Sequence, residues 1–355
     1  MANHSSAVVI PKQSAWKRLV ENLRPTTPAA LRFAALRRFA IGITILTVAG
    51  HAYLGFEQSI AQPLVAVLVC YLTDLFLETV TSRNAQRRPA FVAEATSSVR
   101  VKVTTLIDFL LPAHISGLAL GMLLYASNRL DLFVVAAVVA MSSKYCFRVW
   151  TGKRSNHYFN PSNFGIVVMI LLFPETISIA APYQFTENLG PSGDIILPIV
   201  VAFIGLFLNI VFTVRVPLIA AWIGGFVLQA AVRSAIDPLV DFDAALAPLT
   251  GMAVILFTLY MVTDPGTTPR STRGQIIFGL SVAFVYGLLM VFHMVFGVFV
   301  ALVIVCACRG ILMAVSNRRR TDILIAHDVI NGAGLETASL NACQPAKYGY
   351  EIDAK

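Results

Sequence analysis

Residues 274–308 read GQIIFGLSVAFVYGLLMVFHMVFGVFVALVIVCAC and contain no Asp, Glu, Lys or Arg. A single helix of this length would be roughly 50 Å long, whereas the hydrocarbon core of a bilayer is about 30 Å thick. We therefore predict two membrane-spanning helices here, residues 274–291 and 294–316, joined by a tight turn at Phe292–His293.

The composition of the whole chain is that of a membrane protein. Of its 355 residues, 57% are hydrophobic and 13% are charged, and the mean hydropathy is +0.74. Soluble domains carry about 25% charged residues, so the excess apolar surface requires lipid. This composition excludes a soluble enzyme, a disordered chain or a nucleic-acid-binding domain as the default. We expect a lipid bilayer as the partner and no nucleic acid. The five scattered cysteines form no C-x-x-C pair, so no metal site is expected.

Apolar runs of suitable length predict ten membrane-spanning helices, which makes the chain an all-α polytopic membrane protein. Their expected ranges are 37–55, 59–80, 103–126, 129–147, 162–182, 194–213, 216–235, 248–263, 274–291 and 294–316. Residues 1–36 form a basic tail in which residues 16–24 have the pattern of a short interfacial helix. Residues 317–355 form a polar tail.

The basic residues predict the orientation of these helices. If the N-terminus is cytoplasmic, only Arg129 and Arg233 of the 27 Lys and Arg residues fall on the outer side. This asymmetry is the positive-inside rule, and it supports an even number of spans with both termini in the cytoplasm.

Ten spans divide into two halves of five, about 37–182 and 194–316, and an odd number per half predicts an inverted repeat. The third span of each half carries a similar segment, LPAHISGLA at 111–119 and APLTGMA at 247–253. Proline and glycine favour a break in the helix there, although packing of small residues explains the pattern as well. The candidate residues for a pathway or polar cavity are His114, Ser116, Gly117, Thr250 and Gly251.

Ionisable and polar groups within the predicted spans are costly and are candidates for function by default. They are His51, Asp74, Glu78, Asp108, His114, Asn209 and His293. Asp74 and Glu78 lie four residues apart, so they share a helix face near the inner end, where basic loop residues offer partners. His114, beside Ser116, is the strongest single candidate for a polar cavity, and His293 is expected in a turn.

Two cytoplasmic loops have an unusual density of hydroxyl, amide and basic groups. They read TGKRSNHYFNPSNFG at 151–165 and TDPGTTPRSTRGQ at 263–275. Asn160-Pro161 is typical of a helix start, and Asp264-Pro265 of a helix end. Helix punctuation alone accounts for both loops, but their composition also suits a phosphate or another anion. The candidate cofactor-binding residues are Asn160, Asn163, Thr263, Asp264, Thr267 and Thr268.

These loops also carry a family resemblance. The segment at 160–165 resembles the F-N-P-A-x-x-G segment, and residues 263–279 resemble the T-D-P-x-[ST]…G-[RK]-x-I-[FY]-G segment, of the membrane subunits of ion-pumping redox complexes. These are the flavin-binding membrane subunits of the Rnf electron-transport complex and of the sodium-translocating NADH:quinone reductase. The resemblance covers about residues 105–315 and implies a membrane-linked redox function in the inner (plasma) membrane of a bacterium.

One departure from this family concerns its cofactor. Family members hold a covalent FMN on a D-G-x-[ST]-x-A-T motif in a long outer connection after the fifth span. The corresponding connection here, residues 183–193, is short and lacks that motif. The resemblance therefore implies no covalent cofactor, and a flavin or quinone would be bound non-covalently.

Further segments, at 51–59, 111–114, 182–187 and 263–269, resemble one branch of the family, the integral membrane proteins encoded in enediyne natural-product clusters. This implies a biosynthetic setting with other membrane or biosynthetic subunits as partners.

Three functions remain open at this point. The first is electron transfer through a non-covalent flavin or quinone. The second is a channel or secondary transporter for a small solute or natural product, and the third is a membrane scaffold for biosynthetic enzymes. No nucleophile–base pair, Walker loop or dinucleotide fingerprint is visible, so the sequence does not decide whether the protein is an enzyme.

Overall fold

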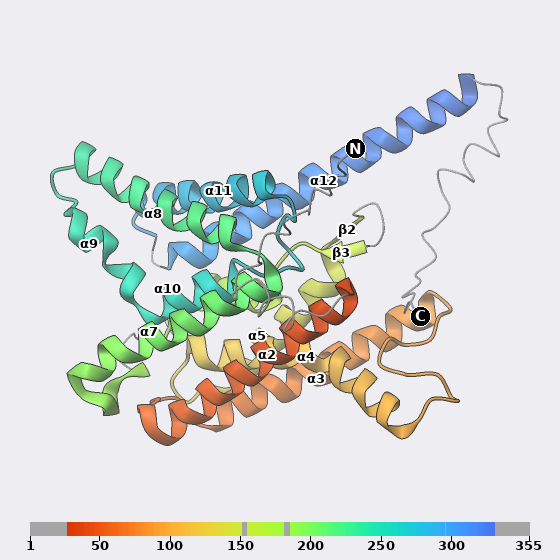
Figure 1. The fold of residues 1–355 in the computed structure, drawn as a ribbon, viewed down its shortest axis with the longest axis horizontal. Helices are drawn as coiled ribbons and strands as arrows, with labels where there is room; N and C mark the ends of the chain where they lie inside the picture. The colour runs from red at the N-terminus through yellow and green to blue at the C-terminus, as the bar shows by residue number, and fades with distance from the viewer. Residues whose placement is uncertain (1–26, 151–154, 181–184, 295, 331–355) are drawn as a thin grey trace, which may run out of the picture.

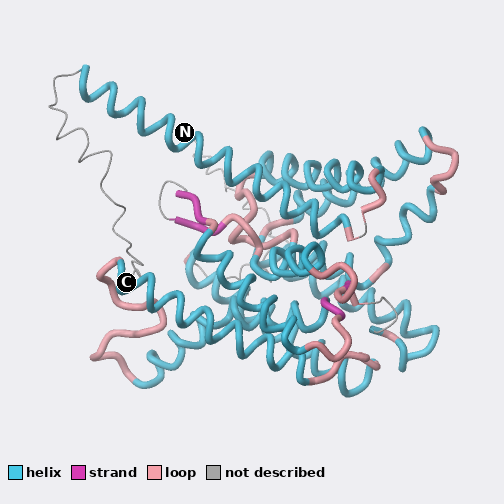
Figure 2. The backbone as a smooth tube through the Cα atoms, turned by 180° about the vertical axis from the view of Figure 1, so that it is seen from behind, coloured by secondary structure: helices cyan, strands magenta, loops and turns pink. Residues whose placement is uncertain are grey.

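The computed structural model describes residues 27–150, 155–180, 185–294 and 296–330. The interfacial helix expected at 16–24 and most of the C-terminal tail lie outside these residues. Almost all of the regular structure is helical, as Figure 2 shows, and two short two-stranded ribbons complete it. This agrees with an all-α membrane protein.

The N-terminal half contains five α-helices. They are α2 (Pro28–Ala49), α3 (Ala61–Asn84), α4 (Val99–Leu123), α5 (Leu130–Cys146) and α6 (Pro161–Leu172). The side chain of Thr27 caps the start of α2, and this helix continues as the π-helix η1 (Gly50–Leu54).

The C-terminal half is more irregular. It contains the 3₁₀-helix η3 (Glu187–Leu189), α7 (Gly190–Leu208), the π-helix η4 (Asn209–Thr213), α8 (Val216–Ile236), α9 (Phe242–Leu246), the 3₁₀-helix η5 (Ala247–Thr250), α10 (Met252–Leu256), the π-helix η6 (Phe257–Met261), α11 (Thr272–Val291) and α12 (Gly297–Ile330). The predicted turn between the last two helices is confirmed, since α11 ends at Val291 and His293 has a positive φ of 54°.

Seven helical segments are long and apolar enough to cross a membrane. They are Ala30–Leu54, Ala61–Asn84, Val99–Leu123, Glu187–Thr213, Val216–Ile236, Thr272–Val291 and Gly297–Arg318. An eighth span is formed if the bent pair Phe242–Thr250 and Met252–Met261 is counted as one. Helices α5 and α6 are shorter, with 17 and 12 residues. The structure therefore supports a multi-pass membrane protein with seven or eight full-length spans among the described residues.

The two predicted helix breaks differ in outcome. The chain bends by 65° between the segments ending at Thr250 and beginning at Met252, so the break at Gly251 is confirmed. The expectation of a break at Pro112 is wrong, because α4 continues through this proline to Leu123. Close packing against α3 accounts for the difference: a Cβ added at Gly117 would lie 2.6 Å from the Cα of Val67.

Similar helix pairs pack in the two halves. In the first half α3 packs on α4 and α5, α5 on α6, and α2 on α4. In the second half α8 packs on η6 and α11, α11 on α12, and α7 on α10. Figure 1 shows α2–α5 on one side of the molecule and α8, α11 and α12 on the other, with α7 and α10 between them.

The first helix of each half also ends in the same way. A π-helix closes both α2 and α7, and the next residue, Gly55 or Val214, has a left-handed conformation. The amide N–H of Gly55 donates to the carbonyl of Gly50, and that of Val214 donates to the carbonyl of Asn209.

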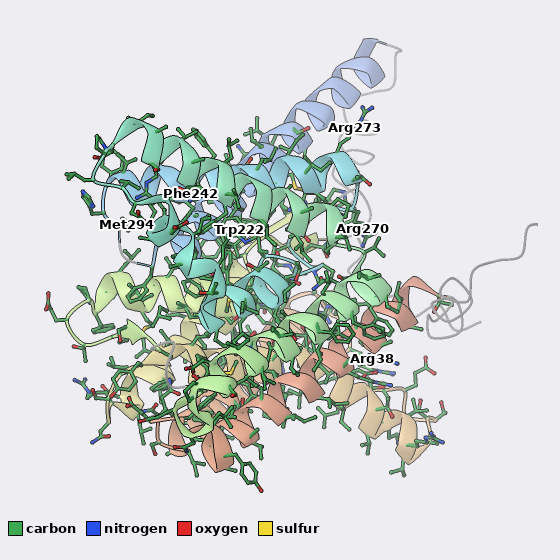
Figure 3. The ribbon with its side chains drawn as sticks, turned by 60° about the vertical axis from the view of Figure 1, so that its left-hand side comes forward. Arg38, Trp222, Phe242, Arg270, Arg273 and Met294 are labelled. Atoms are coloured by element: carbon green, nitrogen blue, oxygen red, sulfur yellow. The ribbon has the colours of Figure 1, made fainter. Side chains whose placement is uncertain are left out.

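The molecule has a basic end. Ribbon β2 (Arg148–Trp150) with β3 (Ser155–His157) lies there beside α12, since the side chain of Asn317 donates to the carbonyl of Trp150 at 2.7 Å. Figure 3 shows Arg38, Arg270 and Arg273 on one side of the molecule, and Phe242 and Met294 on the other. The second ribbon, β1 (Leu124–Tyr125) with β4 (Ser178–Ile179), follows the C-terminal ends of α4 and α6. Both loops singled out in the sequence belong to the basic end.

Candidate functional site

The first loop ends in a well-formed helix cap. The Asn160 Oδ1 accepts the Asn163 N–H at 3.1 Å and the Ser162 hydroxyl at 2.8 Å, and Pro161 is the first residue of α6. Asn163 is 1% exposed, and its Nδ2 donates to the carbonyl of Phe299 in α12 at 3.1 Å. Its Oδ1 is buried and has no hydrogen-bond partner among the described residues. The predicted cap is confirmed, and Asn163 offers one unused acceptor.

The second loop is folded around Asp264. Its Oδ1 accepts the Gly266 N–H at 2.8 Å, its Oδ2 accepts the Thr267 hydroxyl at 3.3 Å, and its carbonyl accepts the Thr268 hydroxyl at 2.6 Å. The Thr263 hydroxyl donates to the carbonyl of Leu259 at 2.7 Å. The three threonine hydroxyls therefore shape the loop from inside, because each donates its proton within the chain.

The two loops meet beside α12. A Cβ added at Gly266 would lie 3.2 Å from the Nε2 of His157, so the loops are in direct contact. Arg309 of α12 donates to the carbonyl of Thr267 at 2.7 Å, and the ring of Tyr158 lies close against Gly310. The contact of Asn163 with α12 completes the arrangement. Segments separated by about a hundred residues thus form one site.

A buried arginine, which the sequence did not single out, belongs to this site. Arg215 is only 4% exposed, and its Nε has no hydrogen-bond partner within the described ranges. Burial lowers its pKa; the nearby carboxylate of Asp264 opposes this effect, whereas Arg270 and Arg309 add to it. The only signal in the sequence is its position in a two-residue connection between apolar runs.

The second missed residue is Gln275 in α11. Its Nε2 donates to the carbonyls of Val214 at 3.2 Å and Arg270 at 3.3 Å. Its Oε1 is buried and lacks a partner in the part of the chain that the structure describes. Since Val214 precedes Arg215, this second unused acceptor lies close to the buried arginine.

Asp264 supplies the negative charge of the site. Burial raises the pKa of its carboxyl, and the Gly266 N–H, the Thr267 hydroxyl and the cations Arg32 and Arg215 oppose that rise. The site therefore combines three arginines with one carboxylate that is costly to ionise.

The predicted pathway residues do not form one cluster. His114 is hydrogen-bonded to Thr44 and Tyr71, and Ser116 is 5% exposed. Thr250 is exposed and donates to the carbonyl of Ala247 at 2.7 Å, next to the break at Gly251. No hydrogen bond described between these residues links the break to His114, because α4 and η5 belong to different halves.

The membrane carboxylates have basic partners. Asp74 pairs with Lys144 at 2.8 Å, Glu78 with Arg87 at 2.7 Å, and Asp108 with Arg37 at 2.7 Å. The expectation that Glu78 meets a basic loop residue is confirmed. Within the described ranges, no group of three or more His, Cys, Asp or Glu residues could hold a metal ion.

Comparison with known proteins provides no relative. No model of a known family matches the chain, and no curated protein is similar to it.

Proposed function

We propose that the protein transfers electrons in the membrane by means of a flavin or quinone bound non-covalently at its basic end. The observation that carries this proposal is the meeting of both loops with α12 around the buried Arg215, which has no acidic partner at ion-pair distance among the described residues. The site draws on both halves, since Asn163 belongs to the first and Arg215 to the second.

The unused polar groups fit a flavin ring. Within the described part of the chain, the Asn163 Oδ1 and the Gln275 Oε1 are acceptors without donors, and the Arg215 Nε is a donor without an acceptor. A flavin ring presents both N–H and C=O groups, whereas a quinone presents only acceptors, so the two free acceptor oxygens favour the flavin. When bound, the group supplies the ability to accept two electrons and pass them on. The part of the chain is to hold the ring edge and to stabilise negative charge through Arg215.

The architecture proposed with this function has ten spans arranged as two inverted repeats. The similar helix pairs and the matching π-helical ends of α2 and α7 support the repeat. The basic end then faces the cytoplasm of a bacterial inner membrane. The setting that we propose is natural-product biosynthesis of the enediyne type, with other biosynthetic subunits as partners.

The visible spectrum of the purified protein tests this function. The protein is prepared in mild detergent from flavin-replete cells, and its spectrum is recorded before and after acid precipitation. We expect flavin absorption near stoichiometry that moves to the supernatant on precipitation. Arg215→Gln should lose the colour, whereas Arg273→Gln, which changes an exposed arginine, should retain it. A colourless wild-type protein contradicts a flavin, and colour that stays in the pellet contradicts non-covalent binding.

Transport is the second candidate, and the bend at Gly251 favours it. Irregular helices at membrane depth are tolerated where they line a cavity, and discontinuous helices form the substrate sites of many transporters. The 65° bend separates a 3₁₀ segment from a π segment within one apolar stretch. Solute flux into proteoliposomes, compared between wild type and Gly251→Leu, tests this alternative.

A further inference from the structure

A line of polar side chains crosses the N-terminal half. Tyr71, Asp74 and Glu78 lie at positions i, i+3 and i+7 of α3 and therefore share one face. Thr44, Thr47 and His51 repeat the same spacing along α2 and its π-helical end. His114 of α4 joins the two rows, since its ring contacts Thr44 on one side and Tyr71 on the other.

The hydrogen bonds around His114 fix their own direction. The Thr44 hydroxyl donates to the carbonyl of Ala40 at 2.7 Å, so its oxygen accepts from the His114 Nε2–H at 2.8 Å. The Nδ1 is then unprotonated and accepts the Tyr71 O–H at 2.7 Å. This assignment makes the imidazole neutral and produces an unbroken chain from phenol to imidazole to hydroxyl.

Toward the basic end the line continues through two buried carboxylates. Asp74 is 0% exposed and accepts Lys144 Nζ at 2.8 Å and the Tyr145 hydroxyl at 2.7 Å. Glu78 is 3% exposed and accepts Arg87 at 2.7 Å and the Ala90 N–H at 2.8 Å.

Other charged and titratable groups surround this line. The thiol of Cys70 is close enough to Asp74 to interact electrostatically with it. The ring of Phe109 lies 5.2 Å from Lys144 Nζ. Arg37 of α2 and Asp108 of α4 pair with each other. Each carboxylate on or beside the line is therefore compensated by a cation at rest.

Toward the opposite end the line reaches His51. Thr47 is 7% exposed, and its carbonyl lies 2.9 Å from the His51 Nδ1. The buried Nε2 of His51 has no hydrogen-bond partner among the residues that the structure describes. This ring nitrogen is therefore available to exchange a proton at the far end of the line.

The line is long enough to matter for the whole membrane. Each row spans seven residues, about 10 Å, so the two rows in series cover about 20 Å of the ~30 Å hydrocarbon core. Successive members of a row are about 5–6 Å apart, a gap that one bridging water spans.

We propose that this line conducts protons between the two faces of the membrane. In one transfer Tyr71 gives its hydroxyl proton to Nδ1 of His114, and Nε2 gives its proton to Thr44, whose own proton moves on toward Thr47 and His51. Tyr71 regains a proton from the side of Asp74, so each group gains one proton and loses one, and no electron is moved. The ion pair with Lys144 keeps Asp74 ionised at rest, which makes this carboxylate the point of proton entry. The path needs no bound cofactor and stands apart from the proposed electron transfer.

Proton flux into proteoliposomes tests this path. A potassium gradient with valinomycin sets the potential, and a trapped pH-sensitive dye reports internal pH. Wild type should exceed empty liposomes, and Tyr71→Phe should reduce the excess about tenfold or more, which corresponds to a barrier higher by at least ~1.4 kcal/mol. The matched control is Tyr286→Phe, which removes a hydroxyl from a buried tyrosine of the other half and should leave the flux unchanged.

A purely structural role for these residues predicts a different set of results. Thr44→Ser retains a hydroxyl and should conduct, whereas Thr44→Val should not. His114→Ala should lose the flux and regain part of it when imidazole is added, because free imidazole can replace the missing relay group but cannot replace a helix contact. Wild-type flux equal to that of empty liposomes overturns the proposal. Unchanged flux in Tyr71→Phe, or loss in His114→Ala without imidazole rescue, overturns it as well.

Discussion

Asp264 combines two roles that conflict at neutral pH. Its carboxylate organises the second loop through Gly266 and Thr267, yet burial raises its pKa. A carboxyl whose pKa is raised on folding contributes stability that is present at low pH and lost as the pH rises through the folded-state pKa. The loop is therefore held against an electrostatic cost once Asp264 ionises.

The stability of Asp264→Asn should depend on pH differently from that of wild type. The difference in Tm, wild type minus variant, should fall as the pH rises from about 4 toward 8, because only wild type must ionise a buried group. Each unit by which the pKa is raised corresponds to about 1.4 kcal/mol, so we expect a change of about 1–3 °C for a chain of this size. Thermal unfolding in detergent at several pH values measures it. A difference that is constant with pH, or that grows, would contradict the raised pKa.

The residues that the sequence revealed and those that it missed differ in a physical way. Asn160 was predictable because its role is local: its side chain caps the helix that begins one residue later. Arg215 was not predictable, because its burial depends on Asp264, Arg270 and Arg309, which are brought near it only by the fold. The threonines of the second loop were correctly located, but their hydroxyls turn inward to loop and helix carbonyls.

Among the helices, the contact of α3 with α4 is a very close backbone approach. A Cβ at Gly117 would lie 2.6 Å from the Cα of Val67, and one at Gly121 would lie 2.5 Å from the Cα of Pro63. Small residues four apart allow two helices in lipid to pack backbone against backbone. Gly117, which the sequence suggested for a pathway, serves this packing.

Gly117→Ala should therefore destabilise the protein although alanine favours a helix. Backbone atoms of α3 cannot move aside cheaply, so we expect a loss of about 1–3 kcal/mol, measured as a lower Tm in detergent. Gly42→Ala is the matched control, because a Cβ at Gly42 meets no described atom within 4 Å and the same change in helix propensity should stabilise by up to ~1 kcal/mol. If both variants behave alike, α3 and α4 are not packed as described.

The lengths of the helices show where apolar runs mislead. The run at 162–182 predicts a full span, but α6 ends at Leu172, directly before Phe173-Pro174. Proline restricts the residue before it and removes a backbone donor, so it stops a helix that has nothing to hold it. Pro112 has the same chemistry, but its helix is packed against α3, and α4 continues. Apolar composition cannot distinguish these two cases, because the difference lies in tertiary contacts.

Considered as a whole, the molecule has basic residues at one end, and this polarity determines how it should sit in a membrane. The loops at Arg87, Arg148 and Arg270 all belong to that end, as do the proposed site and the start of the proton path. This asymmetry was predictable from loop charges alone, because the positive-inside rule needs only the order of the spans. Whether the 12-residue α6 crosses the membrane was not predictable in this way.

The position of Glu175 decides between eight and ten spans. Helix α6 is only about 18 Å long, which alone is too short for the hydrocarbon core. However, Ser178 pairs with Tyr125 in the β1–β4 ribbon, and Tyr125 follows the C-terminal end of α4, far from the basic residues that precede this helix. Glu175 should therefore lie on the face opposite Glu94. In a background without the native cysteines, a membrane-impermeant maleimide added to intact cells should label Glu175→Cys and Asp243→Cys but not Glu94→Cys, which should react only after permeabilisation. Labelling of Asp243→Cys without Glu175→Cys would mean that α5 and α6 form a re-entrant pair, and labelling of Glu94→Cys in intact cells would reverse the orientation.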